Sequence, residues 1–423
     1  MRGSSTSSEA DIAPPMGAGI TRRPRTKVAV LVGALEVGGA ELDIVRNFPL
    51  LSRDEFEVVV VCFQSPGALA AVLEQQGVRV VARGVEFPLA TTPSVIRLVK
   101  KALYTIGVVR WIGRTLRAEQ TDIVHFFLPH SYGYGMLACL LTRSSAKRVM
   151  SRLSLNFYAK EHRILSMLEK HVLHRRLDIA IGNSQLILDE LGEEGVEADK
   201  LRLLYNGIDV ERFTRGVGDR ERAREALGLA PDAYVMAAVG NLWNHKGHRE
   251  LIDACALARE SLPSGWRLLI AGRDEEDNRA AYERLIAGHG LGGRVTMLGE
   301  SDDVRVLLWA ADVFVQPSHH EGLPNAVLEA MAASVPVIGT RVGGIPEAVS
   351  EDSGWLLEAK NTSALSATLV EAATDPAQRG RKGEQGRVRA VADFSLRRSV
   401  SEYEAIYRGL TPPVSALHRS YRL

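Results

Sequence analysis

Two glutamates at a fixed spacing are the residues of this chain best suited to binding a hydroxylated ligand. They bound the stretch Glu321-Gly-Leu-Pro-Asn-Ala-Val-Leu-Glu329, the first in a predicted loop and the second in the helix that follows. Carboxylates accept charge-assisted hydrogen bonds, so the pair can hold different hydroxyl groups of one extended ligand, such as a sugar and a ribose. An arbitrary pair would more simply be a loop charge and a solvated helix residue. The Glu-Gly-Leu-Pro context before an apolar helix favours a binding site here.

Three glycine-containing segments, 33–41, 318–325 and 340–347, each lie between a predicted strand and a predicted helix. Glycine lets the backbone approach a ligand closely, and free N–H groups at a helix N-terminus bind anions. Pro324 and Pro346 suit a first helical turn, and the residues before them offer no capping oxygen. One such loop is weak support for a phosphate site, but three together favour it. None is a Walker loop or a complete G-x-G-x-x-G, which argues against a nucleotide hydrolase or a dehydrogenase.

Two series of short apolar strands must position these loops. The first series is predicted at 27–32, 57–62, 78–81, 122–125 and 178–182, and the second at 234–239, 267–271, 295–298, 313–315 and 335–338. Wholly apolar strands alternating with helices are typical of a parallel sheet covered on both faces. The sequence therefore predicts an α/β protein with two doubly wound, Rossmann-like domains that face a cleft.

The same pattern predicts the domain boundaries. We expect a disordered tail at 1–26, an N-terminal domain at 27–205, a linker at 206–224, a C-terminal domain at 225–395, a C-terminal helix at 396–410 and a second tail at 411–423. The linker is predicted from its turn residues and its polarity.

Composition bounds the function and the compartment. The chain has 423 residues, a formal net charge of +1 and 46% hydrophobic residues, so no global charge points to a nucleic-acid partner. Three cysteines far apart in sequence form no disulfide framework and no zinc spacing. The first 26 residues lack the apolar core of a signal peptide, and no stretch approaches the roughly 20 apolar residues that span a bilayer. We therefore expect a cytoplasmic protein, attached at most to the membrane surface.

The chain resembles the family 4 glycosyltransferases of GT-B fold from about residue 28 to residue 410. The resemblance rests on motifs that occur in the order of the family: Gly38-Gly-Ala-Glu41, Asp122-Ile-Val-His125, Asn183-Ser184, Tyr205-Asn-Gly-Ile-Asp209, Lys246-Gly-His248, Glu321-x7-Glu329 and Val342-Gly-Gly-Ile-Pro-Glu347. It implies a C-terminal helix that crosses back to the N-terminal domain. It also implies retaining transfer of a hexose-type sugar from a nucleoside diphosphate sugar to a saccharide or lipid-linked acceptor, in polysaccharide or glycoconjugate synthesis.

The resemblance also implies roles for individual residues. Glu329 would hold the donor ribose, and Glu321 would hold sugar hydroxyls near the anomeric carbon. Lys246 would neutralise the diphosphate as it leaves, a form of charge stabilisation that is usually a large catalytic effect. His125 is expected to face the cleft and to take part in catalysis. The rest of the expected donor site comprises Gly39, Asn241, Gly322, Leu323, Pro324, Gly343 and Gly344.

No Asp-x-Asp metal site is recognisable, so we expect a donor substrate and neither a metal nor another cofactor. One cation is missing from the family pattern, which has an arginine a few residues before the lysine. Asn241 stands there, after Gly240, and either Arg341 or His245 is a candidate to replace the missing charge.

The N-terminal half departs from the family pattern as well. Phe127 occupies the place of a second histidine, and His130 lies nearby. The usual histidine after the next strand is absent. In that region Arg152 and Asn156 are either ligand contacts or loop anchors.

Residues 93–119 carry six basic side chains among many apolar ones, which is compatible with a helix on an anionic membrane. At about 100° per residue, however, the basic residues at 97, 100 and 101 lie nearly opposite those at 110, 114 and 117. Either Gly107 divides the segment into two helices with separate faces, or the segment is an ordinary Rossmann helix with a solvated edge.

Two other functions remain open from the sequence. A GT-B sugar-nucleotide 2-epimerase would need no acceptor, and a catalytically silent nucleotide-sugar-binding protein would be compatible with Asn241 and Phe127. The sugar, the nucleotide base and the acceptor are not identified by these residues.

Overall fold

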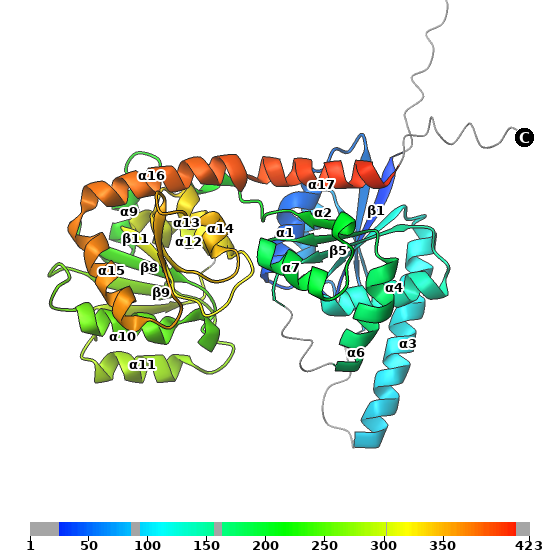
Figure 1. Ribbon diagram of the computed structural model, residues 1–423, viewed down its shortest axis with the longest axis horizontal. Helices are drawn as coiled ribbons and strands as arrows, with labels where there is room; N and C mark the ends of the chain where they lie inside the picture. The colour runs from blue at the N-terminus through cyan, green and yellow to red at the C-terminus, as the bar shows by residue number, and fades with distance from the viewer. Residues whose placement is uncertain (1–24, 86–93, 156–162, 302, 412–423) are drawn as a thin grey trace, which may run out of the picture.

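The computed structural model describes residues 25–85, 94–155, 163–301 and 303–411. Two α/β domains lie side by side, and two consecutive helices run along one side of both (Figure 1). Nearly all of the two predicted tails lies outside the described residues. Thr26, placed in the first tail, instead begins the first strand.

The N-terminal domain is built on a seven-stranded parallel sheet in the order β3-β2-β1-β4-β5-β6-β7. Its strands are β1 (Thr26–Val32), β2 (Phe56–Cys62), β3 (Arg79–Ala82), β4 (Ile123–Phe127), β5 (Lys147–Arg152), β6 (Ile179–Gly182) and β7 (Leu201–Leu203). Its helices are α1 (Gly39–Asn47), α2 (Ala70–Gln75), α3 (Ser94–Ala118), α4 (Pro129–Leu141), α6 (Arg163–Leu168) and α7 (Gln185–Glu193), and a π-helical turn covers Glu169–Leu173.

The C-terminal domain has a six-stranded parallel sheet in the order β10-β9-β8-β11-β12-β13. Its strands are β8 (Val235–Val239), β9 (Arg267–Ala271), β10 (Val295–Gly299), β11 (Val313–Gln316), β12 (Val337–Thr340) and β13 (Gly354–Leu357). Its helices are α8 (Val210–Phe213), α9 (Asp219–Ala226), α10 (His248–Ala258), α11 (Arg279–Gly288), α12 (Val304–Ala310), α13 (Asn325–Ala332), α14 (Ile345–Ala348), α15 (Thr362–Thr374) and α16 (Pro376–Asp393).

The expected fold class is confirmed. Each sheet is covered on both faces, because alternate residues of its apolar strands enter different cores. In β1, for example, Ala29 and Leu31 belong to one buried cluster, whereas Val28, Val30 and Val32 belong to the other. Strand order reverses between β1 and β4 and between β8 and β11. Ligands of such sheets bind beyond the carboxyl ends of the strands at this reversal.

The last helix, α17 (Leu396–Leu410), crosses back to the N-terminal domain as expected, and Figure 1 shows it continuing the line of α16. Val400, Tyr403 and Tyr407 enter the core that contains β1. The hydroxyl of Tyr403 also donates a hydrogen bond to Oδ2 of Asp43 in α1, at 2.8 Å.

The predicted linker, 206–224, is too long. Ile208, Val210 and Phe213 are buried in the C-terminal core, and α8 and α9 occupy much of the segment. The chain passes from one domain to the other at two points, near Ile208 and near Ser395, and these lie side by side. The N–H of Ile208 donates to the carbonyl of Phe394 at 2.9 Å, and the N–H of Leu396 donates to the carbonyl of Ile208 at 2.8 Å. The linker was predicted from the polarity of this segment. That signal was misleading because short amphipathic helices bury only a few residues each and leave the others exposed.

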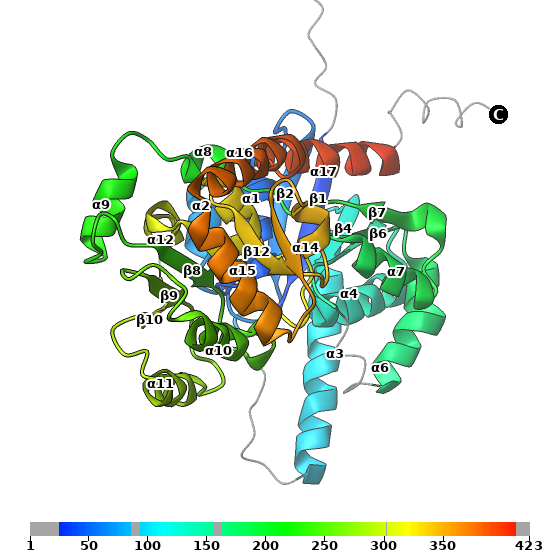
Figure 2. The same cartoon turned by 60° about the vertical axis from the view of Figure 1, so that its left-hand side comes forward.

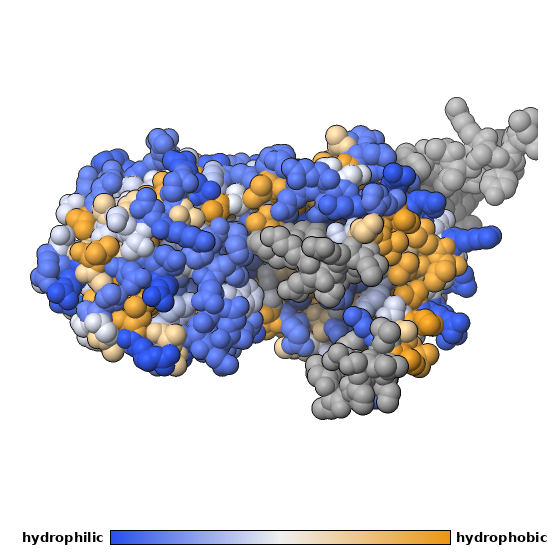
Figure 3. Space-filling view, turned by 60° about the horizontal axis from the view of Figure 1, so that its bottom comes forward, coloured by the Kyte–Doolittle hydropathy of each residue, from blue (hydrophilic) through white to orange (hydrophobic). Residues whose placement is uncertain are grey.

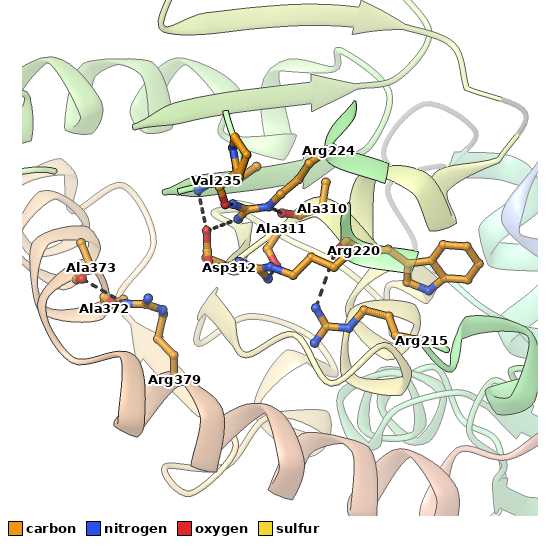
Figure 4. Close-up of polar contacts among 12 residues, drawn as sticks. Arg215, Arg220, Arg224, Val235, Ala310, Ala311, Asp312, Ala372, Ala373 and Arg379 are labelled. Carbon is orange, nitrogen blue, oxygen red and sulfur yellow. Dashed lines mark hydrogen bonds and ion pairs between the residues drawn. The ribbon is translucent and has the colours of Figure 1, made fainter. Parts of the chain in front are cut away.

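A buried ion-pair cluster fixes α9 to the C-terminal sheet (Figure 4). Asp312 accepts hydrogen bonds from Arg220 at 2.7 Å, from Arg224 at 2.9 Å and from the backbone N–H of Val235 at 2.8 Å. Arg224 is 4% exposed and also donates to the carbonyls of Ala310 and Pro231. All three nitrogens of its guanidinium are therefore used within the domain.

Helix α3 is continuous from Ser94 to Ala118, so Gly107 does not divide it. Tyr104, Val108 and Ile112 are buried against the domain. The earlier half of the helix extends away from the rest of the molecule (Figures 1 and 2).

Candidate active site

A cavity of about 1010 Å³ lies between the two domains. Most of its lining comes from the segments that follow β1, β4, β5, β8, β9, β10 and β11, around the strand reversals of both sheets. Eight of the residues predicted for the site line this cavity: Gly39, Asn241, Lys246, Glu321, Gly322, Leu323, Pro324 and Glu329. Gly39 and Glu329, 290 positions apart in sequence, thus line the same cavity.

Lys246 and Glu321 form an ion pair in the wall contributed by the C-terminal domain. Nζ of Lys246 donates to Oε1 of Glu321 at 2.7 Å, and both side chains are largely buried. The same oxygen accepts from Oγ of Ser318 at 2.7 Å and from Nε2 of Gln316 at 3.1 Å. This network fixes the orientation of the carboxylate and keeps the ammonium group at the cavity.

Glu329 forms an ion pair across the cleft. Arg46, in α1 of the N-terminal domain, donates to Oε1 of Glu329 in α13 at 2.7 Å. Glu329 is buried and Arg46 is partly buried. The two domains therefore share the carboxylate that the resemblance assigns to ribose binding.

The start of α13 opens on the cavity. Its first residue is Asn325, its N-cap is Pro324, and no side chain caps it. Nδ2 of Asn206 holds the loop by donating to the carbonyl of Leu323 at 2.9 Å. The expected open helix end is thus present, although Pro324 lies just before the first turn and not within it.

Gly343 and Gly344, expected to contact the donor, do not line the cavity. A side chain at Gly343 would collide with the carbonyl of Glu321, and the N–H of Gly344 donates to the carbonyl of Gly322 at 2.5 Å. The two glycines therefore allow close backbone packing behind the Glu321–Gly322 loop. Gly322 in turn lies against the carbonyl of Leu153, and its lack of a side chain lets the two domains approach closely at this point.

His125 does not face the cleft, contrary to expectation. It is 0% exposed, its Nδ1 lies 2.6 Å from the Tyr407 hydroxyl, and its Nε2 lies 2.8 Å from Oγ of Ser151. Strand alternation explains this, because Ile123, His125 and Phe127 share the face of β4 that α17 covers. Burial lowers the pKa of His125 to about 3, so the ring is neutral. It links α17 to Ser151, which does line the cavity.

Neither residue considered for the missing cation fits that role. Arg341 does not line the cavity, and its Nε lies 3.8 Å from Glu358. His245 does line it and stacks on His320 at 4.3 Å. Burial, and then the charge of Lys246, lower the pKa of His245 to about 4, so it carries no charge near neutral pH.

The sequence did not identify the acidic group in the wall contributed by the N-terminal domain. Glu169, in the π-helical turn, lines the cavity and is 3% exposed. Burial raises the pKa of Glu169 to about 7. The positive charge of Arg152 lowers this pKa in part, and the negative charge of Glu194 raises it further. Arg152 pairs with Glu194 at 2.8 Å and also lines the cavity. The pair with Glu194 anchors Arg152, and its place at the cavity leaves a contact with a ligand as a prediction, whereas Asn156 lies outside the described residues.

Leu128, beside this group, has a left-handed backbone with φ of 71° at the start of α4. Such conformations are uncommon for residues other than glycine and often occur near functional sites. Leu128 and Pro129 line the cavity, whereas His130 does not.

Among the described residues, no three His, Cys, Asp or Glu side chains are grouped as metal ligands. Over the same residues, no helix combines the length and apolarity needed to cross a membrane.

Comparison with known proteins agrees with this architecture. The family model described as Glycosyltransferase Family 4 matches residues 37–212, and the one described as Glycosyl transferases group 1 matches residues 219–389. The chain belongs to glycosyltransferase family 4. It is a transferase of GT-B fold that acts on nucleotide sugars in glycoconjugate synthesis.

Individual relatives of this family 4 glycosyltransferase are distant but span nearly the whole chain. The N-acetyl-alpha-D-glucosaminyl L-malate synthase of Bacillus anthracis is 23% identical over 84% of this chain and 97% of its own. The UDP-Gal:alpha-D-GlcNAc-diphosphoundecaprenol alpha-1,3-galactosyltransferase of Escherichia coli is 25% identical over 88% and 94%.

Solved structures show the same fold. The Anabaena protein HepE in complex with UDP-glucose superposes with a TM-score of 0.76 at 22% identity, over 91% of this chain and 100% of its own. Sucrose-phosphate synthase from Thermosynechococcus elongatus has a TM-score of 0.74 at 23% identity, over 91% and 99%.

Proposed function

We propose that the protein is a retaining glycosyltransferase that moves a hexose-type sugar from a nucleoside diphosphate sugar to a saccharide or lipid-linked acceptor. The observation that carries the proposal is the placement of Lys246, Glu321 and Glu329 along one wall of the cleft, opposite Gly39. One cation and two carboxylates in the same wall match a ligand in which a diphosphate joins a sugar to a ribose.

The donor is assigned to this wall residue by residue. Glu329 accepts hydrogen bonds from the ribose, and Glu321 accepts them from the sugar. The diphosphate lies between Lys246 and the backbone of Gly39, with the uncapped start of α13 offering N–H groups to its oxygens. Asn241 lies beside Lys246 in the same loop.

In the reaction, the bond between the anomeric carbon and the diphosphate oxygen breaks while the acceptor oxygen bonds to the same face of that carbon. The departing phosphate takes the proton of the acceptor hydroxyl, so configuration is retained without a protein nucleophile. Lys246 stabilises the negative charge that develops on the leaving group. No metal is required in this scheme, because the cation is a side chain.

The acceptor is assigned to the opposite wall. Tyr132, Arg152 and Glu169 line it together with the strained backbone at Leu128. A buried carboxyl group there is suited to accept a hydrogen bond from an acceptor hydroxyl. The π-helical turn that carries Glu169 is a rare feature that often occurs at functional sites.

The relatives indicate which donors and acceptors to test first. The name of the Escherichia coli relative specifies a UDP-sugar donor and a lipid diphosphate acceptor, and the Anabaena structure holds UDP-glucose. UDP-sugars are therefore the first donors, and polyprenyl diphosphate saccharides the first lipid-linked acceptors.

A lipid-linked acceptor would be reached from the membrane surface, and α3 is the element suited to that contact. Val99, Leu103 and Ile106 are exposed on it, beside the exposed Lys100 and Lys101. Figure 3 shows hydrophobic side chains gathered on the N-terminal domain at the right of the view, the side on which α3 lies.

Flotation tests this membrane contact. We expect the wild type to float with anionic phosphatidylglycerol vesicles at low salt, and Leu103→Asp to abolish the flotation. Absence of flotation by the wild type would remove the membrane contact from the proposal.

The donor site is tested by a screen of UDP-, GDP- and ADP-sugars in EDTA. Thermal shift reports binding, and release of nucleoside diphosphate reports slow hydrolysis of the donor. We expect one donor to stabilise the wild type and to be hydrolysed, and Lys246→Ala and Glu321→Ala to lose the hydrolysis. Arg284→Ala and Glu283→Ala, on α11 outside the cavity, are charge-matched controls. If no donor binds the wild type, the proposal fails. A donor that binds without any turnover would favour the catalytically silent nucleotide-sugar-binding protein.

A further inference from the structure

The donor site lacks one cation that the family pattern contains. Asn241 is neutral, and its Nδ2 donates to Oε1 of Glu275 at 3.2 Å. Lys246 is already paired with Glu321. A diphosphate carries at least two negative charges near neutral pH, so the lysine alone leaves most of that charge unbalanced.

Arg273 lies beside Asn241 in space, although Asn241 follows β8 and Arg273 follows β9. The N–H of Gly240 donates to the carbonyl of Ala271 at 2.9 Å, and that of Leu242 donates to the carbonyl of Arg273 at 2.8 Å. A side chain at Gly272 would collide with the carbonyl of Gly240. The loops after β8 and β9 are thus in direct backbone contact, and Arg273 lines the same cavity as Asn241 and Lys246.

The guanidinium of Arg273 reaches across the cleft to the glycine loop of the N-terminal domain. One terminal nitrogen donates to the carbonyl of Val37 at 2.6 Å, directly before Gly38 and Gly39. This is the loop assigned to the diphosphate from the opposite side. The contact holds the cation where both domains meet the proposed leaving group.

The acidic neighbours of Arg273 position it without neutralising it fully. Glu275 lies 3.4 Å away and Glu300 lies 3.5 Å away, and their side chains are 39% and 57% exposed. Exposed pairs at such distances are weak because water screens them. The arginine itself is 34% exposed, so part of the guanidinium remains open to a ligand.

We propose that Arg273 supplies the second cation of the diphosphate site, in place of the arginine that position 241 lacks. The inference rests on the proposed function. A guanidinium offers a planar fork of N–H donors that matches phosphate oxygens, and it stays charged at all physiological pH values. Since Arg273 also contacts Val37, it couples binding of the diphosphate to contact between the domains.

The experiment is calorimetric titration of the full-length protein with UDP, GDP and ADP in EDTA. Arg273→Ala removes the cation. Arg273→Gln removes the charge while keeping a donor for the Val37 carbonyl, which covers the case in which the alanine variant does not fold. Arg284→Ala is the charge-matched control, and Arg341→Ala tests the rival cation. The double variant Arg273→Ala with Asn241→Arg places a cation at the family position.

We expect the nucleoside diphosphate that binds the wild type to lose at least about tenfold in affinity in both Arg273 variants, as for loss of a charged hydrogen bond. Arg284→Ala and Arg341→Ala keep wild-type affinity, and the double variant recovers a large part of the loss. Unchanged affinity in Arg273→Gln, or an equal loss in Arg341→Ala, would overturn the assignment while leaving the donor site intact. Failure of the wild type to bind any of the three would overturn the proposed function and this inference together.

Discussion

Ion pairs between basic side chains and carboxylates occur in two settings in this protein, around Asp312 and along the cleft. Around Asp312 two arginines and a backbone N–H converge on one carboxylate inside a single domain. Along the cleft each pair joins two separate segments, as in Lys246–Glu321, or two domains, as in Arg46–Glu329. The first arrangement fixes one element to a sheet, and the second surrounds a cavity.

The difference lies in what remains available to a ligand. Arg224 uses all of its guanidinium nitrogens on protein oxygens and is almost wholly buried. The cleft pairs border a cavity of about 1010 Å³. An ion pair that lines no cavity, such as Arg224–Asp312, can act only on stability, whereas an ion pair beside a cavity can be reorganised by substrate. The predictions below test that distinction.

The largest effect is expected on stability at Asp312. Asp312→Ala leaves Arg224 buried beside Arg220 without a counter-charge, which typically costs about 3–5 kcal/mol. Chemical denaturation of the variant and the wild type measures this difference. A loss below about 1 kcal/mol would show that the cluster is not the structural anchor described above.

Lys246→Ala is expected to act on turnover and not on the fold. Removing a group that stabilises the leaving charge lowers kcat by roughly 10²- to 10³-fold. Single-donor hydrolysis kinetics measure the loss, and denaturation should show little change in stability. An active Lys246→Ala variant would place the leaving-group cation elsewhere.

Glu169→Gln is expected to stabilise the protein at alkaline pH. Because burial raises the pKa of Glu169 from 4.5 to about 7, the folded state favours the protonated carboxyl group. The stability that this gives the wild type is complete below pH 4.5 and is lost as the pH rises through about 7. The uncharged variant avoids the loss, with a gain of roughly 1–3 kcal/mol at pH 8. Denaturation at pH 5 and pH 8 measures the gain in the free energy of unfolding. A gain that does not grow with pH would contradict this expectation.

Arg46→Ala is expected to have the smallest effect. The side chain of Glu329 is only 8% exposed, but it borders the cavity, so water entering the cavity can partly solvate the carboxylate that Arg46 leaves. The cost should lie near the lower end of the range of about 1–3 kcal/mol that an unpaired buried polar group costs. Denaturation of Arg46→Ala alongside Asp312→Ala compares the two settings directly. Equal losses in both would remove the distinction between pairs that line the cavity and pairs that do not.

The sequence predicted the elements whose chemistry is local. Apolar runs identified ten of the strands, and the Glu321–Glu329 spacing correctly placed both carboxylates at one cavity. Three strands were missed. Charged residues flank the short apolar centre of β5, β7 has three residues with an arginine in the middle, and β13 begins with glycine and tryptophan.

What the sequence did not predict depends on contacts between distant segments. The burial of His125 follows from a helix more than 270 residues later, and Gly343 and Gly344 pack against the Glu321–Gly322 loop. Arg273 follows β9 and Lys246 follows β8, so only the order of strands in the sheet shows that the two residues are neighbours. Glu169 carried no motif, and only its burial at the cavity makes it notable.

The central claim is that a nucleotide sugar binds between the domains with its diphosphate at Lys246. The most direct test is a crystal structure with the nucleoside diphosphate selected by the donor screen. We predict ribose hydroxyls on Glu329 and phosphate oxygens within hydrogen-bonding distance of Lys246 and the backbone at Gly39. A nucleotide bound outside the cleft, or with its ribose remote from Glu329, would contradict the account.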